Sequence, residues 1–122
     1  MAKKKILFIG YPKCSTCRKA EKFLRAHGCS EPMRDIKSDH PTAEELRTWH
    51  AQSGLPLKRF FNTSGMLYRE LGLKDKLPAM TEEEQYAVLA SDGMLVKRPL
   101  LIAGDHVLVG FREKEWADCM VK

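Results

Sequence analysis

The stretch Ile6-Leu7-Phe8-Ile9-Gly10-Tyr11-Pro12-Lys13-Cys14-Ser15-Thr16-Cys17 joins an apolar run to two cysteines that are separated by two residues. The segment 4–9 is apolar after its first two lysines, which is typical of a central strand covered on both faces. Pro12 ends the strand pairing, and a helical pattern begins at about Ser15. The cysteine pair therefore stands where a strand turns into a helix, the usual setting of a thiol redox motif.

The segment after the cysteines continues this pattern. Apolar residues recur at helical spacing from Cys17 to Leu24, and Gly28 provides a C-terminal stop. The short segment 33–36 is a candidate for a second strand, roughly parallel to the first. Strand, helix and strand within about 35 residues form a βαβ unit, for which a right-handed crossover is expected.

The segment 41–97 changes character and is expected to be entirely helical. Two capping boxes, Thr42 with Glu45 and Thr81 with Glu84, predict helices that end at Gly54 and near Gly93. Between them, the pattern predicts a turn around residues 57–61 and a short helix that Gly72 ends.

Strands return near the C-terminus. Residues 100–102 and 107–109 flank a Gly-Asp turn and predict a hairpin, while 112–122 carries Trp116 and Met120 at helical spacing and predicts a closing helix. We expect one domain of 122 residues, with a core formed by 1–40 and 98–122 and a helical insertion at 41–97. The aromatic residues Trp49, Phe60, Phe61 and Trp116 are expected in the core.

Composition excludes several classes of protein. With 43% hydrophobic and 30% charged residues, the sequence is that of a soluble globular protein, and no apolar run approaches the ~20 residues of a membrane span. The basic start precedes too short an apolar segment for a signal peptide, so a cytoplasmic location is expected. The net charge is +5, but there is no dense basic run or nucleic-acid motif. We therefore expect neither a membrane nor a nucleic acid as a direct partner.

Cys14 is the candidate nucleophile, because backbone N–H groups and the dipole at a helix N-terminus stabilise a thiolate. Lys13 and Arg18 add positive charge nearby. Cys17, one turn later, is the candidate resolving thiol that closes a Cys14–Cys17 disulfide. The alternative is that Cys14 is simply a small buried residue and Cys17 a cysteine packed in the core. A structural zinc site is a third alternative, but Cys29 and Cys119 do not form a second Cys-x-x-Cys, so we expect no metal.

Four segments together resemble the family of arsenate reductases (ArsC) and Spx proteins: Tyr11–Ala20, Tyr68–Leu73, Lys97–Ile102 and Leu108–Phe111. The resemblance covers nearly the whole chain. It implies an α/β, thioredoxin-like fold of the glutaredoxin type with a mixed four-stranded sheet. It also implies a cis Pro99 that faces Cys14, and a fixed Arg98 guanidinium near the thiolate, suited to an oxyanion or a carboxylate. Ser15, Thr16 and Arg18 are further candidates for binding an anion, although helix capping alone also explains the first two.

The resemblance points to two branches of the family. Arsenate reductases linked to glutaredoxin hold the oxyanion with three arginines. Here Arg98 matches one of them. The second position falls at Asn62, and the third falls at or beside Phe111, with Arg112 next to it. One interpretation of Arg59 and Arg112 is that they reach the same anion site. The simpler one is that both are solvated surface residues. The Cys-x-x-Cys itself matches Spx, a redox switch that binds the α-subunit of RNA polymerase. Gly54 of this sequence falls near a glycine that Spx proteins use in that contact.

These patterns favour a thiol-dependent oxidoreductase that reduces arsenate, another small oxyanion or a protein disulfide. It would carry no bound cofactor and would be regenerated by glutathione, glutaredoxin or thioredoxin. The alternative is an Spx-type regulator whose Cys14–Cys17 disulfide changes its binding to RNA polymerase.

Overall fold

The computed structural model describes residues 6–121, with side chains as far as Cys119, and contains two compact units. One unit is formed by the chain up to Asp35 together with the chain from Arg98, and the other by Ile36–Lys97. The expected segments run close to these bounds, and their grouping into a single domain stays a prediction. Lys4 and Lys5, expected in the first strand, and the side chain of Met120 lie outside the described residues.

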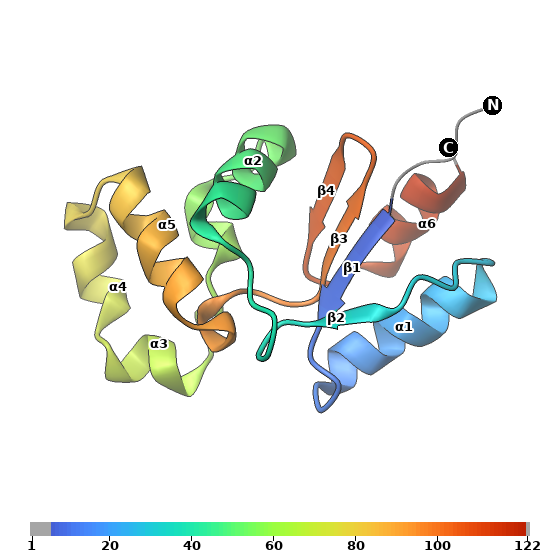
Figure 1. The fold of residues 1–122 in the computed structure, drawn as a ribbon, viewed down its shortest axis with the longest axis horizontal. Helices are drawn as coiled ribbons and strands as arrows, with labels where there is room; N and C mark the ends of the chain where they lie inside the picture. Colours follow the sequence, from blue (N-terminus) through green and yellow to red (C-terminus); the bar gives the residue numbers. More distant parts are fainter. Residues whose placement is uncertain (1–5, 122) are drawn as a thin grey trace. The chain divides into compact units, whose positions relative to one another are not determined.

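The first unit is built on a mixed four-stranded sheet in the order β2-β1-β3-β4 (Figure 1). Its strands are β1 (Ile6–Gly10), β2 (Met33–Asp35), β3 (Leu100–Ala103) and β4 (His106–Val109). The pairing of β1 with β2 is parallel, and the other two pairings are antiparallel. The parallel pair and the hairpin that the sequence predicts are both confirmed. The uninterrupted apolar run of β1 matches its place between two neighbouring strands.

Two helices, α1 (Ser15–Ala26) and α6 (Glu113–Val121), cover one face of this sheet (Figure 1). Phe8 on β1 lies opposite Leu101 on β3, so both side chains leave the sheet on the same face. There they join Ala20, Leu24, Cys29 and Trp116 in one buried cluster. Trp116 donates its indole N–H to the Gly110 carbonyl at 3.1 Å, which satisfies the polar atom of a fully buried ring.

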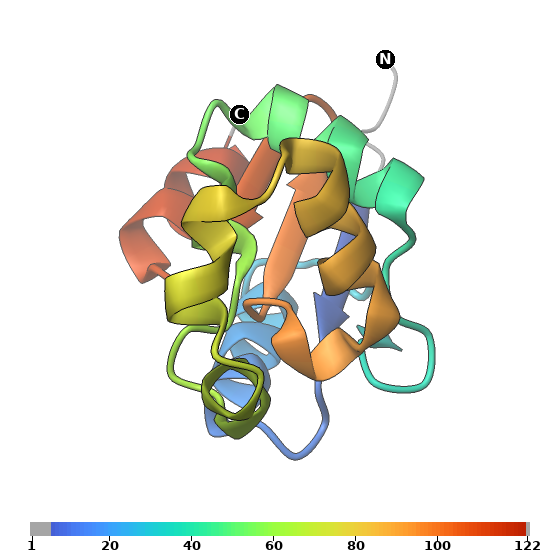
Figure 2. The same ribbon diagram turned by 90° about the vertical axis from the view of Figure 1, so that its left-hand side faces the viewer.

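The second unit contains the two helices that the capping boxes predict, α2 (Ala43–Ser53) and α5 (Glu82–Ser91). In each, the threonine side chain accepts a hydrogen bond from the glutamate amide and the glutamate carboxylate accepts one from the threonine amide. Figure 2 shows α2 and α5 side by side. His50 and Tyr86 are hydrogen-bonded at 2.7 Å across this contact, and Trp49 is buried as expected.

The rest of the second unit contains more short helices than the sequence predicts. The expected turn is η1 (Leu57–Phe60), and the expected short helix is α3 (Met66–Glu70). Gly72 ends it with φ +64°, but α4 (Leu73–Lys76), η2 (Leu77–Ala79) and η3 (Gly93–Leu95) were not expected. The insertion is also not entirely helical, because Phe61 and Val96 form an isolated antiparallel bridge.

Gly93 has a different role from the helix stop that the sequence predicts. It begins η3, and a Cβ atom at this position would lie only 1.7 Å from the Ile36 carbonyl oxygen. The glycine is therefore required by a close approach of two backbone segments within the second unit. Among the described residues, no helix is long and apolar enough to cross a membrane.

Candidate functional site

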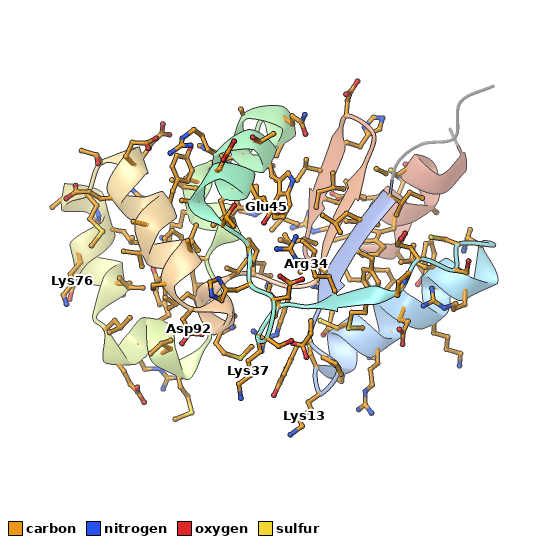
Figure 3. All side chains as sticks on the ribbon, in the orientation of Figure 1. Lys13, Arg34, Lys37, Glu45, Lys76 and Asp92 are labelled. Carbon is orange, nitrogen blue, oxygen red and sulfur yellow. The ribbon has the colours of Figure 1, made fainter. Side chains whose placement is uncertain are left out.

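A tight turn places Cys14 at the start of α1. The Cys14 amide donates to the Tyr11 carbonyl at 2.9 Å, which closes a four-residue turn with Pro12 at its second position, where proline is favoured. The turn follows directly from β1, so the strand fixes its base. Figure 3 shows the Lys13 side chain extending away from the ribbon at this turn. The Cys-x-x-Cys thus lies at the strand-to-helix junction that the sequence predicts.

Cys14 is the N-cap of α1, a position that serine, threonine, aspartate or asparagine usually occupies. Its sulfur accepts a hydrogen bond from the Cys17 amide at 3.4 Å. Burial opposes ionisation, but hydrogen bonds from the Cys17 amide and side chain, together with the hydrogen-bonding and positive charge of Arg98, outweigh it. The pKa of Cys14 is therefore lowered, and the partly exposed sulfur remains open to a reactant.

Cys17 has the opposite character, although it lies only one turn away. Its side chain is fully buried, and this burial, reinforced by the neighbouring Cys14 thiolate, raises its pKa to about 12. A Cβ atom at Gly10 would lie 3.2 Å from both Cβ and Sγ of Cys17, so the absence of a side chain on β1 leaves room for this thiol. The pair therefore combines one thiol that ionises readily with one that stays protonated.

Arg98 is the cation that acts on Cys14. Its Cζ atom lies 5.6 Å from the centre of the Tyr11 ring, a cation–π arrangement that holds the side chain in place. Its Nε and Nη1 atoms are buried and have no hydrogen-bond partner among the described residues. A buried guanidinium with unpaired N–H groups is costly, and an anion or a carbonyl oxygen would satisfy it.

The other predicted site residues have no interaction with the Cys14 sulfur as direct as that of Arg98. The peptide bond between Arg98 and Pro99 is cis, as the resemblance implies, and the Pro99 carbonyl accepts a hydrogen bond from Gly110 at 2.8 Å. Ser15 and Thr16 are exposed first-turn residues of α1. Lys13 and Arg18 are also exposed. That their positive charge stabilises the Cys14 thiolate therefore rests only on their closeness to Cys14 in the sequence. That Pro99 faces Cys14 stays a prediction.

The positions that the resemblance assigns to the two further arginines have structural or surface roles here. Phe111 packs its ring edge-on against Trp116 at 5.0 Å, and Arg112 beside it is exposed with an ion pair to Glu115 at 3.6 Å. Asn62, in the second unit, donates to the Met94 carbonyl at 3.4 Å. Arg59 and Arg112 are surface residues, as the simpler interpretation expects.

Two contributors to the site were not predicted from the sequence. Tyr11 supports Arg98, and Gly10 makes room for Cys17. Both flank the motif, but only the three-dimensional pairing of β1 with β3 brings Tyr11 to an arginine so distant in the chain. Within the described part of the chain, no group of three or more His, Cys, Asp or Glu side chains is placed to hold a metal ion.

Comparison with known sequences identifies related proteins. The sequence profile of the ArsC family matches residues 9–119. The uncharacterized protein YusI of Bacillus subtilis is 53% identical over 113 residues, which span 93% of this chain and 96% of YusI. The global transcriptional regulator Spx of Staphylococcus haemolyticus is 28% identical over 105 residues, or 85% of this chain and 78% of Spx.

Solved structures give a consistent result. The structure of a protein related to the ArsC family from Bacteroides fragilis superimposes with a TM-score of 0.90 at 55% identity, covering 94% of this chain and 97% of that one. A possible arsenate reductase from Streptococcus mutans gives 0.83 at 48% identity, covering 89% and 92%. A glutaredoxin from Archaeoglobus fulgidus shares the fold at 15% identity, with a TM-score of 0.50 and coverage of 98% and 88%. The thioredoxin-like fold of the glutaredoxin type is thereby confirmed.

Proposed function

The chain belongs to the ArsC family, and from this premise we propose that it is a thiol-dependent oxidoreductase with Cys14 as nucleophile and Cys17 as resolving thiol. The observation that carries this proposal is the opposite direction of the two pKa shifts within one helical turn. A low pKa makes Cys14 a good attacking and leaving group, while a protonated Cys17 does not compete for the substrate.

The reaction we propose is a two-step exchange. The Cys14 thiolate attacks one sulfur of a substrate disulfide, forming a mixed disulfide and releasing the other sulfur as a thiolate. The Cys17 thiol gives its proton to water, and its sulfur attacks Sγ of Cys14. This releases the second substrate thiolate, which takes up a proton from water, and leaves a Cys14–Cys17 disulfide. The substrate has then gained two electrons, and glutathione, glutaredoxin or thioredoxin returns two electrons to the protein.

A disulfide fits the site better than arsenate. Arsenate reductases hold the oxyanion with three arginines, and Arg98 is the one that is clearly in register here. Phe111 is partly buried and packs against the apolar core. The unpaired N–H groups of Arg98 can instead bind a backbone carbonyl or a carboxylate of a peptide or glutathione-like substrate. We therefore propose a peptide or glutathione mixed disulfide as the substrate class.

The test measures reduction of a glutathionylated peptide in an assay with glutathione, glutaredoxin or thioredoxin as reductant, and of arsenate in parallel. Cys14→Ser should abolish turnover, and Cys17→Ser should accumulate a mixed disulfide visible as an added mass on the protein. Cys29→Ala, which changes a cysteine outside the motif, is the matched control and should retain turnover. Full turnover by Cys14→Ser would refute the proposal, and preferential reduction of arsenate would refute the substrate class.

A second candidate function rests on the similarity to Spx, which is named as a global transcriptional regulator. In this alternative, the Cys14–Cys17 disulfide would change binding to the α-subunit of RNA polymerase. Gly54, the residue that suggests this contact, ends α2 with φ +69°, which already explains a glycine there. Purified α-subunit should bind only one redox state of the protein. Absence of binding in both states would remove this candidate.

A further inference from the structure

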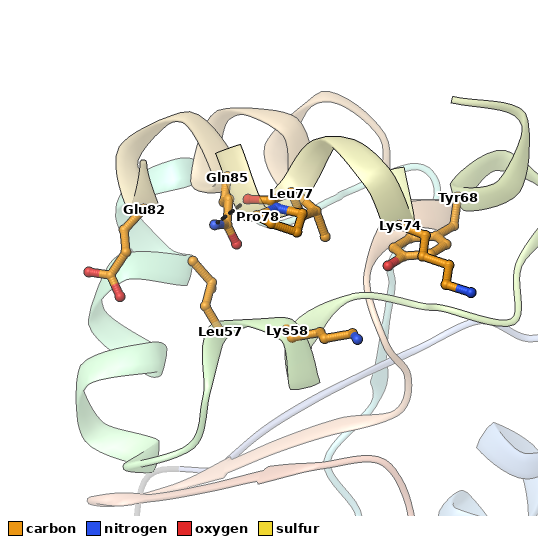
Figure 4. Close-up of a pocket in the computed structure, with 8 residues that line it drawn as sticks. All are labelled: Leu57, Lys58, Tyr68, Lys74, Leu77, Pro78, Glu82 and Gln85. Atoms are coloured by element: carbon orange, nitrogen blue, oxygen red, sulfur yellow. Dashed lines mark hydrogen bonds between the residues drawn. The ribbon is translucent and has the colours of Figure 1, made fainter. Parts of the chain in front are cut away.

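The second unit contains a pocket that has no part in the thiol chemistry proposed above. Its volume is about 280 Å³, close to the lower end of the ~300–1,000 Å³ typical of small-molecule sites. Residues from η1, α3, α4, η2 and α5 line it (Figure 4): Leu57, Lys58, Tyr68, Lys74, Leu77, Pro78, Glu82 and Gln85. Since all of these belong to Ile36–Lys97, the pocket lies within one unit.

Tyr68 is the most informative residue of this pocket. Its side chain is only 5% exposed, and its hydroxyl has no hydrogen-bond partner among the described residues. Figure 4 shows that hydroxyl directed towards the space between the residues that line the pocket. The ring is fixed by an edge-on contact with Phe61 at 6.2 Å between centroids. The hydroxyl of this fixed ring is therefore a donor or acceptor without a protein partner at the edge of the cavity.

Two lysines surround the same end of the pocket. Figure 4 shows Lys58 and Lys74 near Tyr68, while Glu82 lies at the opposite end. Neither lysine forms an ion pair or a side-chain hydrogen bond within the part of the chain that the structure describes. Two unpaired ammonium groups and a free hydroxyl together favour a negatively charged group at this end.

The wall between the two ends is apolar and preformed. Leu57 and Leu77 are each only 7% exposed, and Pro78 extends the same surface. Gln85 donates to the Leu77 and Met80 carbonyls at 3.4 and 3.3 Å, which fixes the turn that carries this wall. An apolar wall leading to a positively charged end is suited to a ligand with both an apolar body and an anionic group.

We propose that this pocket binds a small amphiphilic anion, with its charged group at the end formed by Lys58, Tyr68 and Lys74. Its apolar body lies against the two leucines and Pro78. Glu82 at the far end excludes the reverse orientation, because it would repel the anionic group. A carboxylate and a phosphate share this chemistry, and the experiment separates them.

The experiment is a titration of the full-length protein, labelled with ¹⁵N, with octanoate, octyl phosphate and the uncharged octanol, followed by amide chemical shifts. Saturable shifts at residues 57–58, 68, 74 and 77 are expected with one or both anions and only much weaker ones with octanol. The tighter of the two anions identifies the charged group. Absence of saturable shifts, or equal binding of octanol, would overturn the proposal.

Variants assign the binding to the proposed groups. Tyr68→Phe keeps the ring and should weaken binding about fivefold through loss of one charge-assisted hydrogen bond. The double variant Lys58→Gln/Lys74→Gln should weaken it about tenfold. Lys76→Gln, on the same helix α4 but outside the lining, is the matched control and should bind normally. Unchanged binding by the double variant would refute the site, and the amide spectrum of each variant shows whether it is folded.

Discussion

At the scale of single residues, Cys14 and Cys17 are chemically identical side chains whose pKa values move in opposite directions. The difference comes from position on the helix. Cys14 takes the N-cap, where its sulfur accepts an amide hydrogen bond, while Cys17 points into a space left by Gly10. Because each thiol also acts on the pKa of the other, and Arg98 acts on both, a substitution near one sulfur should alter the acidity of both.

Arg98→Met tests the contribution of the guanidinium. Arg98 lowers the pKa of Cys14 by hydrogen-bonding and by charge, so its replacement should raise this pKa towards the ordinary thiol value. The pH dependence of iodoacetamide alkylation of Cys14 measures the change, and alkylation at neutral pH should be severalfold slower. Arg112→Met removes an exposed arginine of the same unit and should leave the titration unchanged. An unaltered titration in Arg98→Met would contradict the assignment.

Gly93→Ala tests the close approach to Ile36. A Cβ atom 1.7 Å from a backbone oxygen cannot be accommodated by rotating a side chain, so the variant should lose about 3 kcal/mol or more of unfolding free energy. Gly54→Ala is the informative comparison, since that Cβ would meet no atom within 4 Å and its cost comes from φ +69° alone, about 1–2 kcal/mol. Urea unfolding monitored by Trp49 fluorescence measures both. A smaller loss in Gly93→Ala than in Gly54→Ala would contradict this role.

The candidate site residues could be named from the sequence because their signals are local or belong to a motif. Two cysteines three positions apart at a helix start identify Cys14 and Cys17, and the resemblance identifies Arg98. The role of Gly93 could not be predicted in the same way. A glycine needed for a left-handed φ and one needed for space look alike in sequence, and the atom that excludes a side chain here belongs to Ile36.

At the scale of elements, α1 differs from α2 and α5 in how its N-terminus is stabilised. The first turns of α2 and α5 carry two and three acidic residues behind a threonine cap, whereas the first turn of α1 carries none and is capped by Cys14. Acidic side chains at a helix start are stabilising. Their absence from α1 leaves the N-terminal N–H groups available to the thiolate.

Thr42→Ala and Thr81→Ala should each lower the unfolding free energy by about 1 kcal/mol, because each removes one half of a capping box. Urea unfolding followed by Trp49 fluorescence measures the loss. Thr48→Ala changes the same residue type at an exposed site inside α2 and should be neutral or slightly stabilising. If Thr48→Ala were as destabilising as Thr42→Ala, the cap would not be the source of the effect.

The presence or absence of a cap or an apolar period also explains which elements could be predicted from the sequence. Helices with a capping box or a long apolar period, such as α2, α5 and α1, were predicted with nearly the right bounds. The elements α4, η2 and η3 have three or four residues, too few for a periodic pattern to be recognised. Their conformation is set by packing around Leu73, Leu77 and Leu95, which are buried within the second unit.

At the scale of the whole molecule, the two thiols couple protonation to folding. The reduced protein folds with the pKa of Cys14 below 9.0 and that of Cys17 at about 12. A lowered pKa contributes stability that is present above pH 9.0 and lost as the pH falls through the folded value. A raised pKa contributes stability that is present below pH 9.0 and lost between about pH 9 and 12.

The contribution of the cysteine pair to the stability of the reduced protein should therefore pass through a maximum near pH 9. Above this pH, the unfolded chain releases the Cys17 proton while the folded chain retains it, which costs about 1.4 kcal/mol per pH unit. Urea unfolding from pH 7 to 10.5, followed by Trp116 fluorescence in a Trp49→Phe background, reports on the unit that holds the cysteines.

Subtraction of a Cys17→Ala series removes the titration of groups that do not interact with Cys17 and leaves the slope that belongs to the thiol pair. Cys17→Ala should have a lower unfolding free energy at every pH, because it loses buried packing. Above pH 9, the difference in unfolding free energy between the two proteins should shrink by about 1.4 kcal/mol per pH unit. Formation of the Cys14–Cys17 disulfide removes both titrating thiols, so the oxidised protein should lack the maximum. A constant difference between reduced wild type and variant above pH 9 would mean that Cys17 ionises as readily in the folded protein as in the unfolded chain. In that case burial would not separate the two thiols.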